Sequence, residues 1–97
     1  MKNSYMAKFE NNLENARKAM RTATYKSAVC HIAGDAYEFQ YECTINSTLD
    51  GEDCKGQYLA EKLIECCTAI MNARSTEVES YRELLEVSVE AIISFLS

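Results

Sequence analysis

The chain contains no proline, no tryptophan and only three glycines in 97 residues. Turn-rich β-sandwiches and barrels need proline and glycine at their turns, so the scarcity of both argues against such folds and favours long helices. A chain of this length is enough for one domain with one modest core. We therefore expect a single all-α domain over residues 1–97.

Sequence features of membrane, secreted and nucleic-acid-binding proteins are also missing. The longest apolar stretch, residues 84–97, is interrupted by Glu86 and Glu90, and it is shorter than the ~20 residues that span a bilayer. The first 20 residues lack the apolar region of a secretory signal. A net charge of -5 disfavours binding to phosphates. We expect a cytoplasmic protein with no membrane span and no nucleic-acid partner.

Apolar residues recur at intervals of three and four, which is the spacing of a helix face. Four such stripes are present, over residues 4–24, 25–43, 59–73 and 78–95. Residues 46–53 are rich in turn formers and include Gly51, so we expect a loop there that joins the two halves of the domain.

The number of helices depends on two weakly marked breaks, near Thr24 and Ser75. With both breaks, the chain forms an antiparallel helical bundle of three to four helices. With neither break, it forms a long helical hairpin that dimerises into a bundle. Thr76 and Glu79 have the spacing of a capping box, which would start a helix after Ser75.

Charge is distributed unevenly along the chain. The first 26 residues carry six basic side chains against two acidic ones, whereas residues 77–90 carry five glutamates against Arg82 alone. Helices of opposite sign attract each other along their rims. We expect the first and last helices to lie side by side, either in one bundle or across a dimer.

Four of the five cysteines flank the predicted loop symmetrically, and Cys66 is left over. If the two halves fold back on each other, facing residues have a constant sum of indices, which places Cys43 beside Cys54 and Cys30 beside Cys67. This arrangement resembles the twin-cysteine helix hairpins of the mitochondrial intermembrane space, although the spacing here is Cys-x12-Cys in both halves. The resemblance implies a disulfide in each pair. The other interpretation, which we favour, is that the cysteines are small buried hydrophobic residues.

Residues suited to metal binding or catalysis are sparse. A metal site would have to use Cys30, His31, Cys66 and Cys67, but adjacent residues point ~100° apart on a helix and chelate one ion poorly. Ser27, His31 and Asp35 share a helix face, yet a catalytic relay also needs an oxyanion hole. We expect no enzyme activity, no catalytic residue, no metal and no cofactor.

The last helix carries more apolar residues than one inward face requires. Beyond its inward stripe lie Leu84, Val87, Val89, Ile93 and Leu96. Such an excess predicts a partner interface or a central buried helix. The tyrosines, among them Tyr37, Tyr41 and Tyr58, are expected at the core edge or as interface anchors.

We therefore expect a small acidic helical protein that acts by protein–protein interaction, as an adaptor, inhibitor, immunity factor or secretion chaperone does. Its partner is another protein or a second copy of this chain. The alternative is a cysteine-stapled or metal-binding helical hairpin with a redox or metal role.

Overall fold

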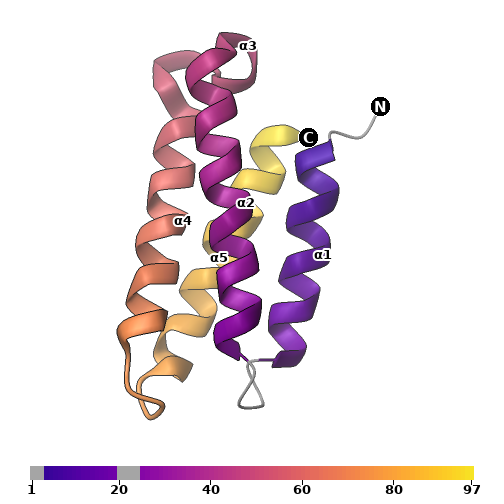
Figure 1. Cartoon of the computed structure of the whole chain (residues 1–97). Coiled ribbons are helices and arrows are strands. Elements are labelled where there is room, and N and C mark those ends of the chain that lie inside the picture. Colours follow the sequence, from indigo (N-terminus) through magenta and orange to yellow (C-terminus); the bar gives the residue numbers. More distant parts are fainter. Residues whose placement is uncertain (1–3, 20–24) are drawn as a thin grey trace.

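The computed structural model describes residues 4–19 and 25–97 of the chain. Four long helices pack against each other and no strand occurs in these ranges (Figure 1), which confirms the predicted all-α bundle. The helices are α1 (Ser4–Ala19), α2 (Tyr25–Ile45), α4 (Lys55–Asn72) and α5 (Val78–Leu96). None of these helices is both long enough and apolar enough to cross a membrane.

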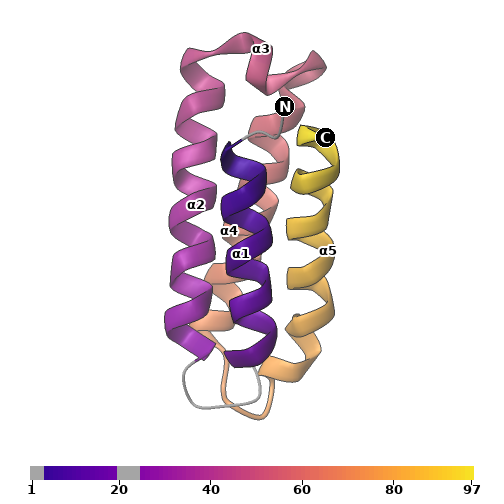
Figure 2. The same ribbon diagram turned by 90° about the vertical axis from the view of Figure 1, so that its right-hand side faces the viewer.

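Consecutive long helices run antiparallel, so the bundle is up-down-up-down (Figures 1 and 2). Helix α2 packs against α1 and α4, and helix α5 packs against the same two helices. Figure 2 shows the consequence: α2 and α5 stand at opposite sides of the bundle. The outward faces of α2 and α5 therefore point in different directions.

The core is formed by the periodic apolar residues of all four helices. Phe39 of α2 is fully buried, and its ring makes edge contacts with Phe9 of α1 at 6.1 Å between centroids and with Phe95 of α5 at 6.4 Å. Edge-to-face pairs of this kind contribute beyond the area they bury. One aromatic side chain thus connects three helices.

The break near Ser75 is present. Helix α4 ends at Asn72 and α5 begins at Val78, so the long hairpin is wrong for the second half of the chain. The predicted capping box is also wrong, because the N-cap of α5 is Glu77 and no side chain caps the helix there; the carboxylate of Glu79 pairs with Arg82 at 3.3 Å.

The structure describes the helices on either side of the first predicted break. Helix α1 ends at Ala19 and α2 begins at Tyr25, and the two helices pack antiparallel. The expected break near Thr24, and the end of the first predicted helix at that residue, fall within residues 20–24, outside the described residues.

The connection expected as a loop over residues 46–53 is mostly helical. It contains a single turn, α3 (Ser47–Asp50), and a 3-10 turn, η1 (Glu52–Cys54). Gly51 has a φ of 79°, and an added Cβ there would lie 2.9 Å from the ring of Phe95. Glycine is therefore required at Gly51 both by the backbone and by the end of α5 that packs against it.

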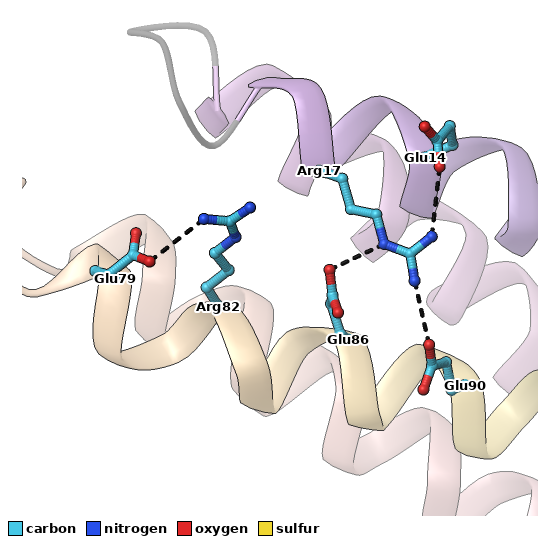
Figure 3. Close-up of polar contacts among 6 residues, drawn as sticks. All are labelled: Glu14, Arg17, Glu79, Arg82, Glu86 and Glu90. Carbon is cyan, nitrogen blue, oxygen red and sulfur yellow. Dashed lines mark hydrogen bonds and ion pairs between the residues drawn. The ribbon is translucent and has the colours of Figure 1, made fainter.

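Helices α1 and α5, which carry opposite charge, lie side by side in one bundle as expected. Figure 3 shows Arg17 of α1 reaching across to α5, where its Nε donates to Glu86 at 2.9 Å and its Nη2 lies 3.2 Å from Glu90. Arg17 also pairs with Glu14 on its own helix at 3.4 Å. One arginine thus contacts three carboxylates at this junction and leaves a net negative charge there.

Candidate functional site

Helix α5 presents large apolar side chains to solvent. Leu84 is 52% exposed and Val87 is 56% exposed. The two residues are three positions apart, so they lie on one face of the helix. These are two of the five residues that the sequence predicts as a partner interface.

A groove of about 210 Å³ runs between α4 and α5 beside Leu84. Its walls are mainly apolar, and it is lined by Lys62, Glu65, Cys66, Ala69, Leu84 and Ser88. Grooves of this kind between antiparallel helices receive apolar side chains of a third helix. We call this groove together with the exposed Leu84 and Val87 the α4–α5 face.

The other three predicted interface residues lie elsewhere. Val89 is fully buried in the core, and Ile93 and Leu96 are half-buried against it. Val89 stands four residues after Leu85 and three before Ile92, so the helical period already places it on the inward stripe. An outward role for Val89 is therefore wrong, and the candidate interface is reduced to Leu84 and Val87.

Acidic residues border the α4–α5 face. Glu83 directly precedes Leu84, and Glu90 follows Val87 by three positions; both are exposed. Over its whole length α5 carries four glutamates against one arginine. The apolar face thus lies beside a negatively charged one, a combination that favours partners bearing basic residues.

A second exposed apolar stripe follows the outer face of α2. Tyr37, Tyr41 and Ile45 are 58%, 64% and 62% exposed and stand at intervals of four. The sequence singles out both tyrosines as anchors or edge residues but not Ile45. The spacing of the three residues could have indicated this stripe, because it repeats the period of a helix face.

All five cysteines lie on the α2–α4 hairpin or in its connection, and all five thiols are free. At one end, Cys43 and Cys54 both hydrogen-bond to the carboxylate of Asp50. Burial, followed by the charge of Asp50, raises the pKa of the Cys43 thiol to about 11, and the hydrogen bond to Asp50 raises that of Cys54. The thiolate is the reactive form of cysteine, so this environment holds both groups in the unreactive form.

The other pair lies near the opposite end of the hairpin. Burial raises the pKa of Cys67 to about 12, with smaller contributions from Cys66 and Cys30. Cys30 is exposed and its sulfur lies 3.9 Å from that of Met71. Cys66, which faces the α4–α5 groove, has a pKa raised by burial to about 11.

The remaining candidates for chemistry are separated from one another or engaged in structural contacts. Asp35 accepts a hydrogen bond from Asn12 of α1, and His31 is exposed. Within residues 4–19 and 25–97, no group of three or more histidine, cysteine, aspartate or glutamate side chains is arranged to hold a metal ion.

Comparison of the chain with known protein families, with curated proteins and with solved structures finds no match.

Proposed function

We propose that this protein binds another protein through the α4–α5 face. The proposal rests on one observation: Leu84 and Val87 are more than half exposed on a helix whose neighbouring groove has mainly apolar walls. Apolar side chains that remain exposed beside a groove gain free energy when a partner covers them. The proposal assigns no catalytic residue.

The partner that fits this face is an amphipathic helix with basic residues along one side. Its apolar side chains would enter the α4–α5 groove, and its basic residues would lie near Glu83 and near Glu90, which also pairs with Arg17. A second copy of this chain is a poor occupant of the same face, because two α5 helices would bring their glutamates together. The role is thus that of an adaptor, an inhibitor or a chaperone for a helical segment.

A synthetic amphipathic helix of leucine and lysine tests this proposal. Fluorescence anisotropy of the labelled peptide should give a saturable curve with the wild-type protein. Leu84→Glu places a charge where the peptide packs and should weaken binding about tenfold or more. Added salt should weaken binding to the wild-type protein in part.

Two controls make the result specific. Tyr41→Glu adds the same charge on α2, at the opposite side of the bundle, and should leave binding unchanged. A peptide with glutamate in place of lysine should not bind. Equal loss with Leu84→Glu and Tyr41→Glu, or binding of both peptides alike, would contradict the proposal.

The cysteine-based alternative has less support. Its cysteines lie on one helical hairpin, but the pKa of Cys43, Cys54 and Cys67 is raised, which disfavours the thiolate that redox chemistry and metal binding require. Free thiols are typical of reducing compartments, so we place the protein in the cytoplasm as part of the same proposal.

A further inference from the structure

The exposed stripe on α2 is longer than its three large residues. Towards the start of the helix, the stripe continues at helical intervals of three and then four to Gly34 and Cys30, both exposed. At ~100° per residue the five positions fall within about 80° of the helix circumference, and their mean direction is about 170° from that of the buried residues. The α2 seam, as we call Cys30, Gly34, Tyr37, Tyr41 and Ile45, is therefore the side of α2 that points directly away from the core.

The presence of glycine at position 34 of the seam is not explained by packing within the bundle. Gly34 lies in the middle of a 21-residue helix, where glycine is less favourable than alanine. An added Cβ would meet no atom of the described residues within 4 Å. No contact within the bundle requires a glycine at this position, whereas close approach of another helix would.

We propose that the α2 seam binds the α2 seam of a second copy of this chain, with the two helices antiparallel. The side chains of the seam are small at its beginning, where Cys30 and Gly34 lie, and large at its end, where Tyr41 and Ile45 lie. An antiparallel pair centred near Tyr37 places Gly34 opposite Tyr41 of the second copy and Cys30 opposite Ile45 of the second copy. Each large residue then fits against a small one, and the two Tyr37 rings meet at the two-fold axis.

Charge favours a second copy at this seam. Glu38, which flanks the seam, is paired with Lys8 of α1 at 3.2 Å, and the other charged or imidazole side chains of α2 beside the seam are one acidic and two basic ones: Glu42, Lys26 and His31. No excess of like charge therefore opposes self-association here. In contrast, α5 carries four glutamates against one arginine, and Arg17 of α1 compensates only part of this charge, so like copies would repel each other at the α4–α5 face.

The size of the seam sets the strength of the association. Its 15 residue steps extend about 22 Å along the helix, which is short for a permanent interface. We therefore expect a reversible dimer whose population depends on concentration. Sedimentation velocity between about 10 µM and about 1 mM should show the mass rising from 11.0 kDa towards twice that value.

Substitutions in the seam provide the first test. Gly34→Leu fills the position that Tyr41 of the second copy would occupy, and Tyr41→Glu adds a charge; each should weaken dimerisation about tenfold or more. Both positions are exposed, and circular dichroism should show an unchanged helix content. Leu84→Glu, on the α4–α5 face, should leave dimerisation unchanged.

Cross-linking provides a test of the register. In a Cys54→Ser background, Ile45→Cys would place its thiol opposite Cys30 of the second copy. Glutathione disulfide, reduced to two glutathione molecules as the two thiols form one disulfide, should give a covalent dimer that Cys30→Ser abolishes. Thr44→Cys, which is also exposed but about 100° away around the helix, is the matched control and should give no dimer.

Several outcomes would overturn the proposal. The protein could remain monomeric at about 1 mM, or form a dimer that Leu84→Glu disrupts and Gly34→Leu does not. A covalent dimer through Cys30 of both copies in the Cys54→Ser protein would indicate a parallel pair. This proposal does not depend on the peptide partner: seam variants test the dimer, and α5 variants test the α4–α5 face.

Discussion

A methyl group added at Gly56 would lie 2.7 Å from the sulfur of Cys43 and 3.1 Å from the carbonyl oxygen of Asp50. The same group added at Gly34 would meet no atom of the described residues within 4 Å. Both glycines lie in helices and neither has a positive φ, so the backbone accepts alanine at both positions. The two positions differ in the space that their neighbours leave for a side chain.

Alanine substitutions should therefore have opposite effects on stability. Gly56→Ala should lower the free energy of unfolding by about 1–3 kcal/mol, because the buried start of α4 cannot move away from α2 without losing contacts. Gly34→Ala should raise it by up to about 1 kcal/mol through helix propensity. Urea denaturation at low protein concentration measures both. A change of the same sign in the two variants would contradict the packing argument.

Asp50 is a buried carboxylate that organises the corner between α2 and α4. It accepts hydrogen bonds from the backbone N–H of Gln57 at 2.9 Å and from the Gln57 side chain at 3.1 Å, besides those from Cys43 and Cys54. Burial by itself would raise the pKa of Asp50, but the hydrogen bonds outweigh it and the pKa lies below its ordinary value of 3.8.

This lowered pKa has a consequence for stability in acid. The unfolded chain binds the Asp50 proton more readily than the folded protein does, so the stabilisation is complete above the unfolded pKa and is lost as pH falls through the folded pKa. Asp50→Asn should therefore reduce stability at neutral pH and flatten its dependence on pH between about 5 and 2. Urea denaturation across this range measures the effect. The exposed neighbour Asp53, as Asp53→Asn, is the control, and an equal flattening there would refute the assignment.

At the scale of the helix, the sequence predicts the core well because each long helix has one face towards it. The period of three and four identifies Phe9 and Leu13 in α1 and Val29 and Ile32 in α2, and all four are buried. Residues 46–53 are a different case, since their short helical turns depend on contacts with Phe95 and Gln57 that no local pattern contains. Local periodicity thus defines the helices but not the corner that joins them.

The candidate site was only partly predictable for a related reason. Helix α5 is apolar on more than one side, and composition alone cannot decide which apolar residues face outward. The structure places Val89 in the core and leaves Leu84 and Val87 exposed, because α4 and α1 cover neighbouring sides of α5. The position of those two helices depends on contacts distant in sequence.

The junction between α1 and α5 depends on Arg17 for its polar contacts. Its side chain is 39% exposed, and ion pairs near the surface contribute little individually. Arg17→Gln should slightly reduce the free energy of unfolding in low salt, and by less in about 1 M salt, which screens such pairs. Lys8→Gln, which removes a single pair with Glu38, is the matched control and should have a smaller effect. A loss for Arg17→Gln that is independent of salt would indicate packing of its aliphatic stem instead.

At the scale of the whole molecule, the up-down-up-down order gives each long helix two neighbours, and three of the four contacts join helices that follow one another along the chain. Contacts close in sequence cost little loop entropy to form. The remaining contact, between α1 and α5, closes the bundle and involves the Arg17 junction. The order of the helices is thus compatible with rapid folding.

Helices α2 and α5 stand at opposite sides of the bundle (Figure 2). This placement also determines how many partner-binding faces a dimer joined along α2 would present. Two copies joined along α2 would carry their α5 helices on the outer sides of the pair, with the two α4–α5 faces pointing apart. Such a pair would be bivalent, and a partner carrying two helical segments would bind it with a higher effective concentration than a monomer could offer. Dilution below the dimer range would then reduce the avidity for that partner while leaving the affinity of each α4–α5 face unchanged.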